Sequence, residues 1–395
     1  MLRRVKPWSS ILQANIRDTF TLDDEQLEPV QSFCYLGVDI KCSGSVKHAL
    51  NVLDEKGNKA LRPLLNVICR FKLPFKTSIK LFHTYISPIL LYNTENMFTD
   101  KDLRKQNSEF IFNNISVSKT DVTHRKFLKF LMGVSKSCPN LAIYGDTGET
   151  PLSLKSYRLT LNFWHRITRL EDTALAKIAL LENIEMRTNW IITIEKLINT
   201  LNLSNKIGNH NNFKHATKSA LDEGFRKWWK KSLENPNLSR LQFYKKIKSE
   251  YGPEKYLSLH DFKTRKYISK LRCSDHALQI EKGRHNHGNT RKEAKDRKCI
   301  FCKNGDIEDE EHFLFKCDTY AQLRSKHDID KVNETSTLFT EEGINDLGKY
   351  LKEAFELRKH RAKILNDLGD GEIAVMVFSY LEYLVYKFLF LITLC

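Results

Sequence analysis

The sequence lacks three features that would assign its class at once. It contains no internal repeat of fixed period, which argues against a solenoid or a propeller. Its nine cysteines form no framework typical of disulfide-rich secreted domains, and the basic opening MLRRVKPWSS has no continuous apolar run like that of a secretory signal. We therefore expect a reducing compartment, cytoplasmic or nuclear, for this chain.

What the sequence does have is apolar content and an excess of positive charge. Its 395 residues are 41% hydrophobic, which is enough for two or three domains with cores. Lysine and arginine number 64 against 48 acidic residues, which gives a net charge of +16. This excess favours polyanionic partners, either nucleic acid or an anionic membrane surface.

One apolar stretch, from Ile373 to Cys395, approaches the length of a membrane span. Glu382 and Lys387 interrupt it, and each charge at mid-bilayer costs about 2.5–3.5 kcal/mol on insertion scales. We therefore expect a buried helix here and no membrane partner, with tail anchoring as the alternative.

Hydrophobic periodicity predicts a mainly α fold. A short strand rich in aromatic and β-favouring residues begins at Phe33, and the turn cluster KCSGS follows it. Apolar residues then recur at helical spacing over residues 50–68, again after Pro74, and again after Pro151, where a proline stands in the favoured first turn. Gly57 is expected to weaken the first of these helices, and the polar stretch 202–218 predicts a linker.

The stretch CIFCKNGDIEDEEHFLFKC predicts a metal site. Cys299 and Cys302 form a C-x-x-C pair, and His312 and Cys317 return a second pair after nine intervening residues. Three sulfurs and one imidazole suit zinc, and a closed Cys3His shell leaves no position for water, so we expect structural zinc. The alternatives are chance clustering and a redox-active C-x-x-C pair, but neither explains the second pair. Cys273 is the next candidate ligand, although it lies far upstream.

Several blocks of the sequence occur in an order that resembles a known family. They are FTLDDEQLEPVQSFCYLGVDI, KALRPLLNVI, KLFHTYISPILLYNTENM, FLKFLMGVSKSCPNLAIYGDTGETPLSL and SDHALQIEKGR, followed by EDEEHFLFKC and YAQLR. Together they resemble the region after the catalytic core in reverse transcriptases of non-LTR (LINE-type, jockey-like) retrotransposons. The resemblance runs from about Phe20 to about Lys359, and within it Tyr35, Leu36 and Gly37 look like the primer-grip motif.

The resemblance implies a domain order. Residues 1–32 are then a remnant that precedes the thumb, 33–200 a primer-grip strand and thumb-like helical domain, 201–270 a linker and helical connector, and 271–359 the zinc-binding domain. Residues 360–395 match no block and form the hydrophobic helix. The expected fold is therefore mainly α, with a helical thumb-like domain after a short β element, a helical connector and a small zinc-stapled C-terminal domain.

We expect no polymerase activity from this chain alone. In the family, aspartates upstream of the primer grip hold two divalent ions for nucleotidyl transfer, and the chain before Tyr35 is too short for a palm domain. Asp23 and Asp24 lack the preceding tyrosine of a Y-x-D-D motif. The family's endonuclease domain is missing on the same ground of length.

Two groups of basic residues are candidates for contacts with RNA or DNA. A thumb holds a duplex through its phosphates, and Lys72, Lys76 and Lys80 recur at helical spacing, although a merely solvated lysine face has the same pattern. The second group lies before the metal motif, whereas the loop 306–311 within that motif is acidic and repels phosphate. It comprises Arg284, Arg291, Lys292, Lys295, Arg297 and Lys298. A flexible basic arm of this kind favours RNA as its target.

Aromatic and histidine residues are weaker candidates. Trp228, Trp229 and Tyr244 could stack on unpaired bases, but paired aromatics at helical spacing are more typical of a core, which we favour. The H-N-H sequence at 285–287 has no nuclease-like context, so we interpret it as coincidence.

Three hypotheses follow from the sequence. The first is a nucleic-acid-binding C-terminal portion of a LINE-type reverse transcriptase, which holds RNA or primer-template without its own polymerase centre. The second is a domesticated or decayed protein whose helical scaffold is an interaction module with no nucleic-acid role. The third is a chain that completes a polymerase together with a separate catalytic fragment.

Overall fold

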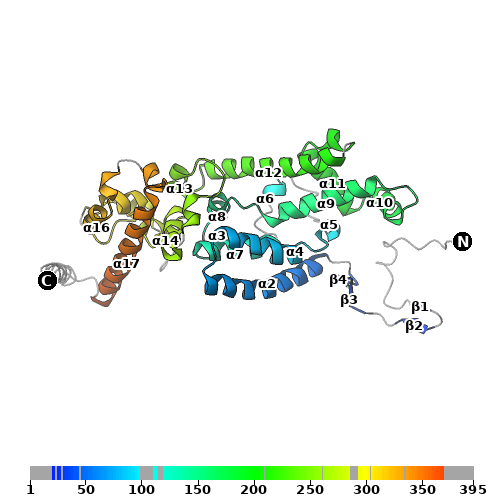
Figure 1. Ribbon diagram of the computed structural model, residues 1–395, viewed down its shortest axis with the longest axis horizontal. Helices are drawn as coiled ribbons and strands as arrows, with labels where there is room; N and C mark the ends of the chain where they lie inside the picture. Colours follow the sequence, from blue (N-terminus) through cyan, green and yellow to red (C-terminus); the bar gives the residue numbers. More distant parts are fainter. Residues whose placement is uncertain are drawn as a thin grey trace. The chain divides into compact units, whose positions relative to one another are not determined.

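The computed structural model of the protein describes residues 20–22, 25–27, 30–43, 46–97, 110–113, 119–208, 210–259, 261–284, 292–302, 304–332 and 335–368. These residues are mainly helical, as the sequence predicts, and their strands form two small two-stranded antiparallel sheets (Figure 1). The chain divides into two compact units, Met1–Ser258 (unit 1) and Leu259–Cys395 (unit 2). This boundary differs from the divisions after residues 200 and 270 that the resemblance implies.

The region that looks like a primer grip is a hairpin and not the single strand that the sequence predicts. Strand β3 (Ser32–Tyr35) pairs with β4 (Val38–Lys41), just as β1 (Phe20–Leu22) pairs with β2 (Glu25–Leu27). Leu36 and Gly37 have φ angles of +47° and +80°, the left-handed pair that a tight hairpin turn requires. The Tyr92 hydroxyl donates to Leu36 O at 2.7 Å and thereby ties the tip of the hairpin to the helices.

The first helices of unit 1 follow the predicted periodicity. Helix α2 (Val46–Phe71) covers the predicted stretch, and the segment after Pro74 forms α3 (Phe75–Leu81), a π turn η1 (Phe82–Ile86) and α4 (Ser87–Leu90). Gly57 has a different role from the one predicted. A Cβ at Gly57 would lie 2.3 Å from Leu90 Cδ2, so this glycine lets α4 pack closely against α2.

The remaining helices of unit 1 continue the packing. They are α5 (Thr94–Met97), α6 (Phe110–Asn113), α7 (Lys119–Met132), α8 (Asn140–Thr147), α9 (Leu152–Thr168), α10 (Leu175–Glu185), α11 (Asn189–Thr200), η4 (Ser204–Lys206), α12 (His210–Glu234), α13 (Gln242–Ile247) and η5 (Lys255–Ser258). Helix α12 runs along α9 (Figure 1). The predicted linker 202–218 is therefore partly helical, and Phe213 within it is buried against the ring of His165, with ring centroids 4.2 Å apart.

The aromatic residues that could have stacked on bases lie in the core of unit 1, as we predicted. Trp229 and Tyr244 are fully buried. The Trp229 indole donates to Leu141 O at 2.8 Å, and the Tyr244 hydroxyl donates to Asp146 Oδ1 at 2.9 Å. Trp228 is half-buried and stacks on Phe225. These rings therefore hold α8, α12 and α13 together.

Unit 2 is built on two packed helices, α14 (Phe262–Arg272) and α17 (Ile344–Leu368). Asp261 caps α14 by accepting from the backbone N–H groups of Lys263 and Thr264. Between the two helices lie short elements: α15 (Gln279–Lys282), η6 (Ala294–Asp296), η7 (His312–Lys316), η8 (Asp318–Tyr320), α16 (Ala321–Lys326), η9 (Ile329–Lys331) and η10 (Thr335–Phe339).

No helix among the described residues is both long enough and apolar enough to cross a membrane. The apolar stretch 373–395, for which the sequence predicts a buried helix, lies outside the described residues.

Candidate metal centre

The first two candidate ligands sit on a tight backbone loop. The Cys299 N–H donates to Asp306 O, and the Glu308 N–H donates to Arg297 O, each at 2.9 Å. Between these two hydrogen bonds the chain reverses direction, and Gly305 supplies a φ of +72° in the reversal. The loop brings Cys302 back beside Cys299.

The second two ligands sit at the two ends of one short helical turn. Asp309 Oδ1 accepts from the His312 N–H at 2.8 Å at the start of η7, and the Cys317 N–H donates to His312 O at 2.8 Å at its end. Arg324 holds Cys317 from α16, because its Nη1 donates to Cys317 O at 2.8 Å. The H-x4-C spacing therefore places both side chains on the same side of the turn.

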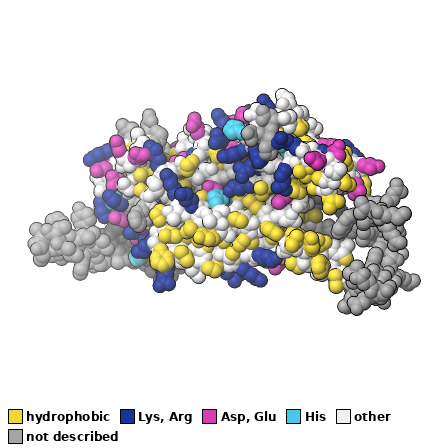
Figure 2. Space-filling model, turned by 45° about the vertical axis from the view of Figure 1, so that its right-hand side comes forward, with side chains coloured by type: hydrophobic (Ala, Val, Ile, Leu, Met, Phe, Trp, Pro, Cys, Tyr) yellow, Lys and Arg dark blue, Asp and Glu magenta, His cyan; other side chains and the backbone are white. Residues whose placement is uncertain are grey.

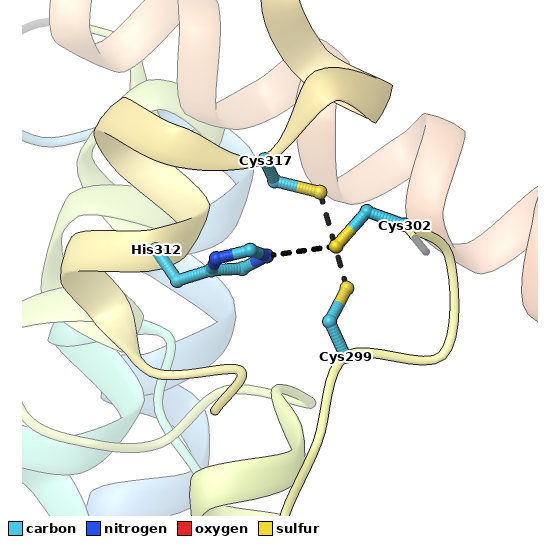
Figure 3. Close-up of side chains that lie close together, drawn as sticks. All are labelled: Cys299, Cys302, His312 and Cys317. Atoms are coloured by element: carbon cyan, nitrogen blue, oxygen red, sulfur yellow. Dashed lines mark hydrogen bonds between the residues drawn. The ribbon is translucent and has the colours of Figure 1, made fainter. Parts of the chain in front are cut away.

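The four side chains converge on one point, as Figure 3 shows. Cys299 Sγ lies 3.9 Å from Cys317 Sγ, and Cys302 Sγ lies 3.4 Å from His312 Nε2. All four ligand atoms are within 4.8 Å of one another. A tetrahedral ion with metal–sulfur bonds of about 2.3 Å has sulfur–sulfur edges of about 3.8 Å, which fits this spacing. The group could hold a metal ion.

The three thiols differ in the direction in which their pKa is shifted. The hydrogen bond between Cys299 and Cys317 raises the pKa of Cys299 and lowers the pKa of Cys317, and burial raises the pKa of Cys302. Without a cation, therefore, the three sulfurs do not all ionise together. A metal ion held by this group would supply the missing positive charge and favour the thiolates.

Carboxylates surround the four ligands. His312 Nδ1 lies 3.5 Å from Asp306 Oδ2, which leaves Nε2 as the ligand atom and places an acceptor beside the other ring nitrogen. Cys299 Sγ lies 3.7 Å from Glu308 Oε1. Glu308 in turn pairs with Arg358 of α17, so the ligand loop is connected to the core of unit 2.

The basic arm before the metal loop is only partly available to a polyanion. Arg297 is buried, and its guanidinium donates to Ile280 O at 2.7 Å and to Lys292 O, so it holds the local fold and is not a phosphate contact. Arg284 pairs with Glu281 at 2.9 Å. Lys292, Lys295 and Lys298 are exposed, whereas Arg291 and the H-N-H sequence at 285–287 lie outside the described residues.

The three lysines of the thumb-like region are exposed. Lys76 and Lys80 lie on α3, one helical turn apart, and Lys72 lies between α2 and α3 with a φ of +48°. None of the three side chains makes an ion pair within the described part of the chain. Tyr35, Leu36 and Gly37 lie at the tip of the β3–β4 hairpin.

Sequence reasoning missed a second cluster, which lies in unit 1. His83, His124 and Glu149 bring three potential ligand atoms within 4.8 Å of one another. They come from η1, α7 and the segment before α9, so no local spacing in the sequence reveals them.

Comparisons of the chain with protein-family models, with curated proteins and with solved structures find no match.

Proposed function

We propose that Cys299, Cys302, His312 and Cys317 bind a structural zinc ion. The observation that carries this proposal is the spacing of the four ligand atoms, which fits a tetrahedral ion with soft ligands. With four protein ligands the shell is closed, so the ion has no position for a reacting water. Its role is to stabilise unit 2. The ion fixes the shape of the ligand loop, and the side chains of unit 2 pack against that shape.

We further propose that the protein binds RNA or DNA as the C-terminal portion of a LINE-type reverse transcriptase, without a polymerase centre of its own. The resemblance in the order of the sequence blocks suggests this function, and the net charge of +16 supports it. Exposed Lys72, Lys76 and Lys80 are free to contact phosphates. Contacts of this type position a nucleic acid without reading its sequence.

The β3–β4 hairpin supports a separate catalytic fragment as a partner. Phe33, Tyr35 and Leu36 are about 60% exposed or more, with values of 60%, 59% and 73%. The hairpin contacts α2 and is tied by Tyr92, but these three side chains face water. A second protein body that covers them would therefore stabilise the hairpin. A polymerase fragment supplied in trans is the partner that the resemblance suggests for this hairpin.

The test combines metal content with nucleic-acid binding in one sample. The purified chain is expected to contain about one zinc ion and to bind single-stranded RNA more weakly as salt rises. Cys302→Ser is expected to lose the zinc and to keep the RNA binding of the unit 1 lysines, with Cys69→Ser, an exposed cysteine of unit 1, as the control. Zinc without RNA binding would overturn the nucleic-acid function and keep the metal site, and absence of zinc would overturn the metal site.

A specific surface favours the interaction module as a second candidate function. Helix α10 exposes several apolar side chains: Leu175 is 86% exposed, and Ile178, Leu181 and Ile184 are also exposed. A group of exposed apolar side chains is typical of a contact with another protein. If the protein ignores RNA and self-associates in sedimentation, and Leu175→Ser with Leu181→Ser abolishes the association, this candidate replaces nucleic-acid binding.

A further inference from the structure

A pocket in unit 1 lies where α9 and α12 pack together. Its volume is about 280 Å³, whereas a water molecule occupies about 30 Å³ of the liquid, so a phosphate group fits with water beside it. Basic side chains also gather in the upper middle of the face drawn in Figure 2. The residues that line the pocket show why its charge is unusual.

Four cations line the pocket from two helices. Lys155 and Arg158 stand one turn apart on α9, and Lys218 and Arg226 stand two turns apart on α12. The side chains of Arg158, Lys218 and Arg226 make no ion pair or hydrogen bond within the described part of the chain.

The acidic side chains of the pocket do not balance these cations. Glu149 and Asp222 are the two carboxylates that line it, and Glu149 already bonds to His83. A concave site with excess positive charge has a focused positive electrostatic potential, which attracts an anion.

His83 positions Lys155 at the pocket. Lys155 Nζ donates to His83 Nδ1 at 2.9 Å, and His83 Nε2 donates to Glu149 Oε2 at 2.7 Å. Both ring nitrogens of His83 are therefore engaged, so Lys155, His83 and Glu149 form a hydrogen-bonded chain. His124 Nε2 lies 3.7 Å from Glu149 Oε2, beyond hydrogen-bond distance. A cation bound there would displace these bonds and face Lys155, which disfavours a metal ion.

The charge of Lys155 depends on the groups around it. Burial lowers the pKa of Lys155, Glu149 raises it, and Arg158 lowers it further. An anion in the pocket would stabilise the ammonium form of this lysine.

We propose that the α9–α12 pocket binds a phosphate group of a nucleic-acid backbone, held by Lys155, Arg158, Lys218 and Arg226. A second hollow of about 510 Å³ shares Lys155 and Arg158 and is also lined by the exposed Tyr92. Two adjoining hollows with shared cations and an aromatic ring suit a single strand with successive phosphates. The phosphate site stands on the pocket alone, and its assignment to a nucleic acid rests on the proposed function.

The test uses the full chain and two double variants of α12. Lys218→Gln with Arg226→Gln removes two charges from the pocket. Lys227→Gln with Lys230→Gln removes two charges from the same helix outside it. Binding is measured by fluorescence anisotropy with single-stranded RNA and by calorimetry with inorganic pyrophosphate. The pocket variant is expected to weaken both bindings by about tenfold or more, and the control variant by less than about twofold.

Each outcome separates the pocket from the proposed function. Equal losses in the two double variants would overturn the pocket, because the loss would then follow charge alone. RNA binding that neither variant weakens would overturn the pocket and leave nucleic-acid binding in place. Pyrophosphate binding that only the pocket variant loses, without any RNA binding, would support the phosphate site and overturn the nucleic-acid function. No binding of either probe would overturn both.

Discussion

Glu308 and Arg358 form a buried ion pair that connects the metal loop to the last described helix of unit 2. Arg358 Nη2 donates to Glu308 Oε2 at 2.8 Å, and the two side chains are almost fully buried. Arg358 also donates to Ala277 O, and its guanidinium lies 4.8 Å from the ring centroid of Phe301. Because Phe301 lies between Cys299 and Cys302, the ligand loop and α17 are packed as one structure.

Arg358→Met is expected to destabilise unit 2 by about 3–5 kcal/mol, because Glu308 would remain buried without a partner. Urea unfolding, monitored through release of the metal, measures this loss of stability. Lys359→Met is the matched control, since Lys359 is exposed on the same helix. Adding Glu308→Gln to Arg358→Met is expected to recover part of the stability. Equal effects of Arg358→Met and Lys359→Met would contradict a structural role for the pair.

Removal of the metal by a chelator is expected to unfold the ligand loop and loosen α17 while unit 1 stays folded. The ligands hold the loop only when a cation balances the thiolates, so its folding free energy depends on metal binding. Hydrogen exchange measured by mass spectrometry separates the two units. Loss of protection over 297–317 with unchanged protection in α7 and α9 is the expected result, and unchanged protection of the loop would count against the site.

Gly57→Ala is expected to destabilise unit 1 by about 1–3 kcal/mol, although alanine is the better helix former by about 1 kcal/mol. The added Cβ would lie 2.3 Å from Leu90 Cδ2, so the buried Leu90 side chain or α4 itself must shift. Thermal unfolding measures the change. Asn66→Ala on the exposed face of α2 is the control and is expected to leave stability unchanged or raise it. A stabilised Gly57→Ala protein would show that the two helices do not pack this closely.

Unit 1 is expected to lose stability in acid through His124. Burial lowers the pKa of His124 from 6.5 to about 3 in the folded protein, and Glu149 opposes the shift. Because the pKa of His124 is lower in the folded than in the unfolded protein, the neutral ring contributes fully to the free energy of unfolding above pH 6.5. This contribution is lost as the pH falls toward 3. Near pH 4 the free energy of unfolding is lower by roughly 3 kcal/mol, because each pH unit below 6.5 costs about 1.4 kcal/mol.

The matched variant for His124 is His124→Phe, because the ring stacks on Phe82 with centroids 5.1 Å apart and a phenyl group preserves this contact. Urea unfolding as a function of pH should show a weaker acid dependence in this variant than in the wild type. His215→Gln, an exposed histidine of α12, should keep the wild-type dependence. The same slope in all three proteins would assign the acid sensitivity elsewhere.

Neutralising Lys76 and Lys80 is expected to weaken RNA binding and to lower the slope of log affinity against log salt by about one for each phosphate that a lysine no longer neutralises. Lys76→Gln with Lys80→Gln is compared with Lys47→Gln and Lys59→Gln, which remove two exposed charges from α2. Anisotropy at several salt concentrations gives both slopes. Identical slopes in the two double variants would show that Lys76 and Lys80 contact only solvent and not phosphates.

Sequence alone predicted the features that short-range geometry controls. The C-x-x-C and H-x4-C spacings bring candidate ligands together within single turns, so this group of four residues could be predicted without the fold. Helical periodicity predicted α2 and α9, because an amphipathic stripe is repeated at each turn. A local error was the turn at Leu36 and Gly37, where the left-handed conformation reverses a segment that was predicted to be one strand.

Tertiary structure alone decided the roles of individual basic residues. Arg297 has the same sequence signature as an RNA contact, but the close approach of its side chain to Gly283 and its bonds to backbone carbonyls bury it. Lys155 and Lys218 are more than sixty positions apart and become neighbours only because α9 and α12 pack together. Whether a cation lines a pocket or bonds within the fold depends on which helices meet, and that is determined by the packing of the whole core.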